Sequence, residues 1–155
     1  MGTQYEGRDE VVRALNTYIK LMRSTAVLGN ALQRSLNKHG LTASQLGVLE
    51  ALLHLGPMCQ RDVGRKLLLS GGNVTTVVTN LETRGLVLRV RSASDRRFVT
   101  LELTTEGRAL IAGVFPAHAE RITELFQGLT PTEQEQLSAL TLKLGRSMGQ
   151  DEDDR

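Results

Sequence analysis

The sequence predicts a mainly α-helical fold that contains one small β-hairpin. Along much of the 155-residue chain, apolar residues recur every three or four positions, which is the period of an amphipathic helix. Two runs rich in leucine and valine, 86–90 and 98–103, enclose a short polar segment, which is typical of a hairpin. Long helical patterns flank these elements at 8–38 and 105–149. We therefore expect one domain over the whole chain, with a central unit, 42–103, between helical arms.

The first segment, 8–38, predicts one long helix. It lacks proline and carries a continuous apolar stripe: Val11 or Val12, Leu15, Ile19, Met22, Ala26, Leu28, Leu32 and Leu36. At about 1.5 Å per residue this helix would be roughly 46 Å long, which is more than a small central unit needs. We therefore expect its N-terminal half to belong to a dimer interface. His39 and Gly40 should end the helix, because glycine is common just past a helix C-terminus.

Two shorter helices are expected next. A T-x-x-Q capping box at 42–45 predicts the start of the first, and Gly56 and Pro57 should end it. Its apolar stripe comprises Leu46, Leu49 and Leu53, with Glu50 on the flank. The segment 60–68 predicts another short helix, with Val63, Leu67 and Leu68 as its apolar residues. A brief turn then leads to a helix at 72–84, and two helices joined in this way form a helix-turn-helix.

The helix expected at 72–84 has an unusual outward face. Its apolar residues share one stripe: Val74, Val77, Val78 and Leu81. The opposite face is short, polar and almost uncharged: Asn73, Thr75, Thr76, Thr79 and Asn80. Exposed helix faces normally carry long charged side chains, whereas short polar groups allow a helix to lie close to base edges in a major groove. Ser70 is the expected N-cap, and Gly85 should end the helix.

The hairpin that follows is basic. Between residues 60 and 98, eight basic residues face three acidic ones, although the whole chain has a net charge of only +2. A polar helix followed by a basic hairpin is typical of a winged helix-turn-helix, in which the hairpin tip reaches phosphates or the minor groove. In an extended segment Asp95 and Arg97 point the same way and Arg96 the opposite way. We therefore expect Asp95 to pair with Arg97, and Arg96 to enter the minor groove.

Two helices are expected after the hairpin. Thr104 should cap the first, 105–127, and Pro116 in its middle should kink it because proline removes a backbone donor. A threonine, a proline and a glutamate within 130–133 combine an N-cap, a first-turn proline and a capping box. They start the last helix, about 131–148. With the first helix of the chain, these helices would build a dimerisation layer that sets the spacing of two DNA-binding units.

These patterns identify a candidate surface for double-stranded DNA. Its residues are Ser70, Gly72, Asn73, Thr75, Thr76, Thr79, Arg89, Arg91, Asp95, Arg96 and Arg97. Each has an ordinary alternative. The threonines and Asn73 could be simple surface residues of a helix start, and Arg89 and Arg91 could form a solvated strand face. Asp95 could be only a turn residue, because aspartate suits tight loops.

The same elements contain several short motifs in a fixed order. They are Gly71, Gly72, Asn73, Val74 and Thr75; then Leu81, Glu82, Gly85, Leu86 and Val87; the triplet Asp95, Arg96 and Arg97; and finally Leu103, Thr104 and Gly107. In this order and spacing, the chain resembles the MarR (multiple antibiotic resistance regulator) family of bacterial transcription factors over nearly its whole length. The resemblance implies a homodimeric DNA-binding regulator, most often a repressor. Its two-fold symmetry would require a near-palindromic operator with half-sites about 10 bp apart.

The resemblance also implies a small-molecule effector. Members of the family bind small, often aromatic, anionic ligands between the dimerisation helices and the DNA-binding unit. The equivalent residues here are Tyr18, Met22, Arg23, Leu53, His54 and Phe115. Tyr18 and Arg23 would suit a phenolic carboxylate. Taken singly, Met22, Leu53 and Phe115 are each better explained as core residues. A second reading of the same fold is a ligand-independent architectural dimer, or one that binds a protein partner.

Other classes of function find little support in the sequence. It contains no catalytic or phosphate-binding motif, and we expect no enzyme and no cofactor. The histidines His39, His54 and His118 are scattered, so no metal site is expected. No apolar run suggests a membrane span or a signal peptide, which favours a cytoplasmic protein. The single cysteine, Cys59, precedes a helix, where the dipole could activate a thiol. Peroxide-sensing relatives carry their cysteine near the start of the first helix, so an inert, partly buried Cys59 is favoured.

Overall fold

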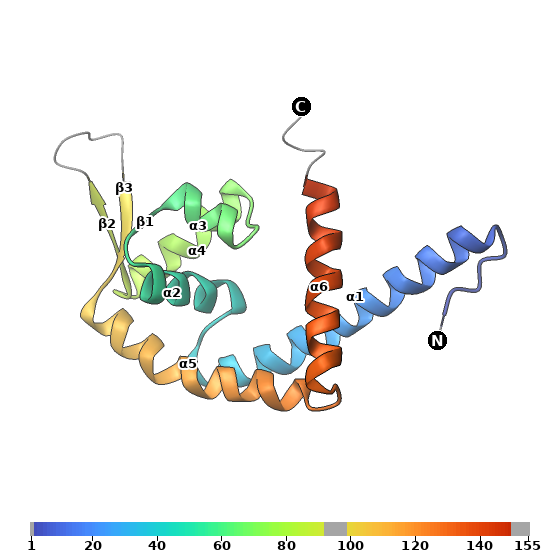
Figure 1. Ribbon diagram of the computed structural model, residues 1–155. Helices are drawn as coiled ribbons and strands as arrows, with labels where there is room; N and C mark the ends of the chain where they lie inside the picture. Colours follow the sequence, from blue (N-terminus) through green and yellow to red (C-terminus); the bar gives the residue numbers. More distant parts are fainter. Residues whose placement is uncertain (1, 92–98, 150–155) are drawn as a thin grey trace. The chain divides into compact units, whose positions relative to one another are not determined.

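The computed structural model describes residues 2–91 and 99–149, and it confirms a mainly helical fold with a small β-sheet (Figure 1). The elements are α1 (Asp9–Leu36), the 3-10 helix η1 (Asn37–His39), α2 (Ala43–Leu55), β1 (Met58–Cys59), α3 (Gln60–Lys66), α4 (Gly71–Thr83), β2 (Val87–Arg91), β3 (Val99–Leu103), α5 (Thr105–Phe126) and α6 (Pro131–Gly149). The chain divides into two compact units, residues 1–119 and 120–155. The first contains every element from α1 to β3.

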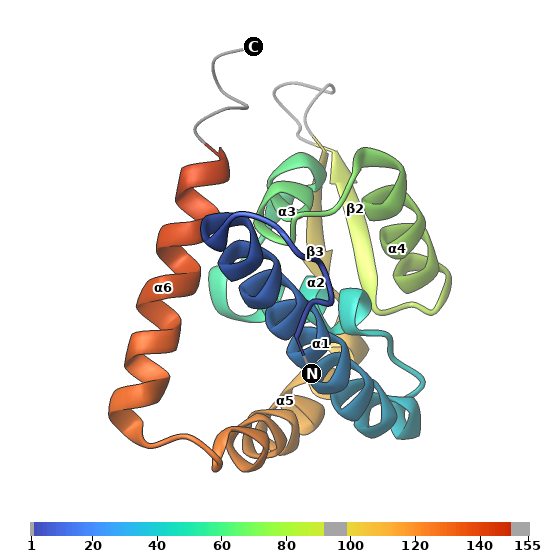
Figure 2. The same cartoon turned by 90° about the vertical axis from the view of Figure 1, so that its right-hand side faces the viewer.

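The sheet is antiparallel, with the strand order β1-β3-β2. The predicted hairpin is β2 and β3, paired from Val87 opposite Leu103 to Arg91 opposite Val99. The two-residue β1, which the sequence did not predict, pairs Met58 with Leu101 of β3. A two-residue strand is too short to show the alternation of apolar and polar residues by which strands are predicted. Figure 2 shows β2 running beside α4, so the hairpin and this helix form one surface.

The core of the first unit brings its helices and sheet together around α2. Val48 and Leu49 of α2, Val78 of α4, Leu101 of β3 and Ile111 of α5 are all 0% exposed. Burial of this kind is the main stabilising term in a domain of this size. The predicted stripe on α2 was too narrow, because α2 also buries these further residues: Val48, Ala51 and Leu52. A central helix is enclosed on more than one face, and a single-stripe reading misses part of its contacts.

The predicted helix caps are present. Thr42 and Gln45 form both hydrogen bonds of the capping box at the start of α2. Ser70 Oγ accepts from the backbone N–H of Asn73 at 3.4 Å, and Thr104 Oγ1 accepts from that of Gly107 at 2.9 Å. At the start of α6, the backbone N–H and hydroxyl of Thr130 both donate to Glu133. These bonds hold the pKa of the Glu133 carboxyl below its usual value.

The end of α3 differs from the prediction. The helix stops at Lys66, and Leu68 has a φ of 52° and a side chain 93% exposed. The N–H of Leu69 donates to Gly64 O and that of Leu68 to Arg65 O, which is the Schellman pattern. The same pattern ends α4, where Gly85 takes the left-handed position with a φ of 70°. A glycine in the sequence predicts a left-handed residue at a helix end, whereas a leucine does not.

The joint between α1 and α2 is held by side chains that the sequence did not single out. Gln33 Nε2 donates to Leu41 O at 2.9 Å, and Gln33 Oε1 accepts from the backbone N–H of Ala43 at 3.1 Å. Arg84, at the end of α4, donates to the carbonyl of Gly40 at 2.8 Å. Gln33 thus connects α1 to the start of α2, and Arg84 connects the end of α4 to the turn at Gly40 that follows η1.

Helices α1 and α6 both carry exposed apolar residues. In α1, only Ala31 and Leu36 are buried, and both lie near its C-terminal end. In α6, every side chain from 131 to 148 is exposed, including Leu140 at 65% and Met148 at 61%. Within the described part of the chain, none of the helices is both long enough and apolar enough to cross a membrane.

Candidate nucleic-acid interface

Helix α4 presents the polar face that the sequence predicted. Its apolar side buries Val74, Val78 and Leu81 in the core. The opposite side is exposed, and it carries Gly72, Asn73, Thr75, Thr76 and Thr79. A Cβ atom added at Gly72 would meet nothing within 4 Å, so packing inside the protein does not require glycine there. This face of α4 therefore carries short, uncharged side chains and is accessible to a binding partner.

The threonine hydroxyls of α4 are arranged in two different ways. Thr75 Oγ1 donates to Gly71 O at 2.9 Å, and Thr76 Oγ1 donates to Gly72 O at 3.1 Å. These bonds commit the hydroxyl hydrogens to the helix backbone, because a carbonyl oxygen can only accept. Thr79 differs, because its Oγ1 is contacted by an arginine of the hairpin.

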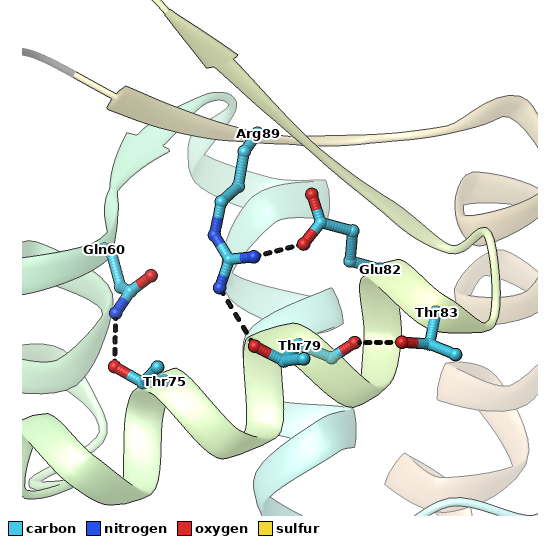
Figure 3. A network of polar contacts seen from close by, with 6 residues as sticks. All are labelled: Gln60, Thr75, Thr79, Glu82, Thr83 and Arg89. Carbon is cyan, nitrogen blue, oxygen red and sulfur yellow. Dashed lines mark hydrogen bonds and ion pairs between the residues drawn. The ribbon is translucent and has the colours of Figure 1, made fainter.

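That arginine is Arg89 of β2, and it forms part of a polar network (Figure 3). Its Nη1 makes an ion pair with Glu82 of α4, and its Nη2 donates to Thr79 Oγ1 at 3.2 Å. The Arg89 and Glu82 side chains are 27% and 37% exposed. Figure 3 shows the guanidinium directed from the strand toward the helix. Arg89 is thus engaged within the protein, and its guanidinium does not extend freely into solvent.

A second contact joins α3 to α4. Gln60, the first residue of α3, donates from Nε2 to Thr75 Oγ1 at 2.8 Å (Figure 3). Nothing in the sequence predicted this role for Gln60 or the ion pair of Glu82 with Arg89. Each partner lies in a different element from the residue that it contacts, so no local spacing rule could find either pair.

Further basic residues lie on the elements next to α4 in the sequence. Arg91 is exposed at the end of β2, beside the start of residues 92–98. Asp95, Arg96 and Arg97 fall within 92–98, outside the described residues, so their expected pairing and minor-groove contact stay predictions. On α3 the exposed side chains of Arg61, Arg65 and Lys66 extend the positive charge. Phosphates favour such clustering of arginine and lysine.

Cys59 is held in a local polar contact. Its Sγ donates to Asp62 Oδ2 at 2.9 Å, and Asp62 also pairs with Arg65. This thiol hydrogen bond, followed by the neighbouring Arg65, holds the pKa of Asp62 below its usual value. The Cys59 side chain is half-buried, and its contact with Asp62 is local to the start of α3.

The candidate effector residues are only partly brought together. His54 and Phe115 meet edge to face, with ring centroids 5.2 Å apart. Leu53 packs against the core, as does Phe115. Tyr18, Met22 and Arg23 lie exposed on α1, so Met22 is not a core residue of the single chain.

Among the residues that the structure describes, no group of three or more histidine, cysteine or acidic side chains could hold a metal ion.

Comparison with known proteins identifies the family. The model of the MarR family matches residues 39–97, which contain α2, α3, α4 and β2, the first strand of the hairpin. The chain is 37% identical over 137 residues to the Bacillus subtilis HTH-type transcriptional regulator YkoM, covering 88% of this chain and 89% of the relative. The alignment with YkoM includes the polar helix α4 and the hairpin of β2 and β3.

Solved structures share the fold. The S. aureus MepR–DNA complex superposes with a TM-score of 0.74 and 27% identity, covering 84% of this chain and 96% of that chain. Bordetella bronchiseptica BpsR, whose structure concerns regulation of DNA binding by 6-hydroxynicotinic acid, gives a TM-score of 0.76 and 29% identity, covering 83% and 98%. The chain described here belongs to the MarR family of helix-turn-helix transcriptional regulators.

Proposed function

We propose that the protein is a homodimeric transcriptional repressor that binds a near-palindromic operator and is released by a small aromatic or anionic effector. In this proposal α4 enters the major groove, and the hairpin tip contacts phosphates and the minor groove. The observation that carries it is the exposed face of Asn73, Thr75, Thr76 and Thr79 on α4, which is free of charge and lies beside a basic hairpin.

The chemistry of that face suits base edges. Short hydroxyl and amide side chains reach base edges only when the helix backbone lies close to the DNA. The glycines at 71 and 72 permit such an approach, since a Cβ added at either would point into open space. The arginines and lysine of α3 and the hairpin would supply the phosphate contacts that fix the register of the helix.

The unburied apolar residues of α1 and α6 support a dimer. Each helix exposes large hydrophobic side chains, such as Met22 in α1 and Leu140 in α6. Contiguous exposed apolar residues of this kind mark surfaces that bind another chain. A two-fold dimer presents two copies of α4 about one helical turn apart, so the half-sites should be centred about 10 bp apart.

An effector could act through the joint at the end of α1. The region around His54 and Phe115 offers an aromatic contact for a flat ligand. Gln33 connects α1 to the start of α2, and Arg84 connects the end of α4 to Gly40, which follows η1. A shift of α1 that moved η1 would therefore reach the DNA-binding helix. A ligand releases DNA only if it binds the non-binding arrangement more tightly than the binding one. BpsR, a similar protein, has its DNA binding regulated by an aromatic acid, 6-hydroxynicotinic acid.

The proposal is tested by binding to a duplex from upstream of the protein's own gene, titrated with salt. The wild-type affinity should fall steeply as salt rises, because lysines and arginines displace counterions from phosphates. Arg96→Ala should weaken binding and flatten the salt slope by about one unit, whereas Thr75→Ala should weaken binding without changing the slope. Arg108→Ala, an exposed arginine on α5, serves as the matched control and should change neither quantity. An unchanged slope for Arg96→Ala would contradict the minor-groove role.

A further inference from the structure

We propose that Arg89 is a positioning residue that acts on DNA through Thr79. Held by Glu82, the guanidinium fixes Thr79 as a hydrogen-bond donor toward an acceptor atom of a base in the major groove. This inference rests on the proposed function, in which α4 is the DNA-binding helix. It replaces the direct DNA contact that the sequence suggested for Arg89.

The direction of the hydrogen bond at Thr79 follows from the chemistry of its partner. A guanidinium group has only donors, so the oxygen of Thr79 must accept from Arg89 Nη2. The hydroxyl hydrogen of Thr79 then needs another acceptor. Thr75, Thr76 and Thr83 donate theirs to the carbonyl four residues earlier, but the described residues show no such bond from Thr79. Thr79 therefore keeps its donor for a partner outside the protein.

Thr75, one helical turn away, has the opposite polarity. Its hydrogen is committed to Gly71 O, and one of its lone pairs accepts from Gln60 Nε2. What remains is an acceptor. The face of α4 thus offers an acceptor at Thr75 and a donor at Thr79. In the major groove, N7 and O6 of guanine, N7 of adenine and O4 of thymine accept, whereas the amino groups of cytosine and adenine donate. Thr79 would read the first group, and Thr75 the second.

The ion pair accounts for the fixed position of Arg89. Glu82 takes Nη1, which leaves Nη2 directed at Thr79. The position of Arg89 on β2 lies opposite Leu101, which is fully buried, so the backbone that carries the guanidinium is anchored in the core. The side chain therefore has little freedom to swing toward a phosphate. The same contacts connect the first strand of the hairpin to α4.

The first test measures how Glu82→Gln changes the specificity of DNA binding. Specificity is the affinity for a duplex selected by the wild-type protein divided by the affinity for random duplex, and it is measured at several salt concentrations. We expect Glu82→Gln to lower this ratio severalfold, because the guanidinium loses its anchor. Arg89→Met should also lower it, with the salt slope unchanged. A slope flattened by about one unit for Arg89→Met would show that Arg89 contacts a phosphate. An unchanged or raised ratio for Glu82→Gln would show that the ion pair does not position Arg89 for recognition. Either result would overturn the inference.

The second test identifies the base pair that Thr79 reads. Each base pair of the selected half-site is changed in turn, and the affinity profile is compared between variants. Thr79→Val should reduce the preference for the correct base pair about fivefold at one position of the half-site. Thr79→Ser should retain that preference because the hydroxyl remains. Arg89→Met should lose discrimination at that same position, and the double variant should be no worse than either single one.

The outcomes separate the inference from the proposed function. If Arg89→Met relaxes a different position from Thr79→Val, or if Thr79→Val changes no preference, the inference fails while DNA recognition stands. If the wild-type protein selects no duplex at all, the proposed function fails and the inference falls with it. Thr79 is exposed, so Thr79→Val and Thr79→Ser should fold even if Arg89→Met is destabilised.

Discussion

Substitution of Gly107 by alanine should destabilise the protein by about 3 kcal/mol, at the upper end of what overpacking normally costs. Gly107 is buried in the first turn of α5. A Cβ at this position would lie 2.9 Å from the carbonyl carbon of Leu86, and closer still to its oxygen. That oxygen also accepts from the backbone N–H of Thr104. Because every atom in the clash belongs to the backbone, the start of α5 would have to separate from the hairpin.

Gly113→Ala, in the same helix, is the matched control. An added Cβ there meets nothing within 4 Å, and alanine is a better helix former than glycine by about 0.5–1 kcal/mol. Urea unfolding of the three proteins should therefore show a large loss for Gly107→Ala and a small gain for Gly113→Ala. Similar midpoints for both variants would contradict the close packing of α5 against Leu86.

Thr76→Glu should reduce affinity for the operator by about 100-fold without reducing stability. Thr76 lies on the exposed face of α4, and its hydroxyl contacts only the helix backbone. A carboxylate at this position would stand against phosphates and base acceptors, and unfavourable charge pairs in an interface cost several kcal/mol. Glutamate is a better helix former than threonine, so α4 itself should be preserved.

Thr105→Glu makes the same change in charge elsewhere. Thr105 is exposed at the first position of α5, where a carboxylate is favoured by the helix dipole. It follows the end of β3, at the opposite end of that strand from residues 92–98. Fluorescence anisotropy with a labelled duplex should show nearly wild-type affinity for this variant. Equal losses for Thr76→Glu and Thr105→Glu would indicate a general charge effect and not a contact at α4.

The sequence was most informative where structure depends on neighbouring residues. The caps at Thr42, Ser70 and Thr104 and the turn at Gly85 were all predicted correctly, because each depends on residues no more than a few positions apart. Leu68 shows the limit of this reasoning. It occupies the same left-handed position as Gly85, but a leucine carries no signal for it.

Contacts between elements could not be predicted in the same way. The sequence identified Arg89 as basic and Thr79 as polar, but it could not show that they meet each other and Glu82. Gln60 and Thr75 are 15 residues apart and touch only because α3 packs against α4. The residues of the DNA-binding face were thus predictable by type, whereas their hydrogen-bond polarity required the structure.

The most direct test of the account is selection of duplexes from a randomised pool by the purified protein, followed by sequencing. We expect enrichment of one sequence motif, repeated in inverted orientation with half-site centres about 10 bp apart, as two copies of α4 related by a two-fold axis require. The enriched duplex should bind far more tightly than random DNA at the same salt concentration. A pool without any enriched motif, or with one unrepeated half-site, would contradict sequence-specific recognition by a homodimer.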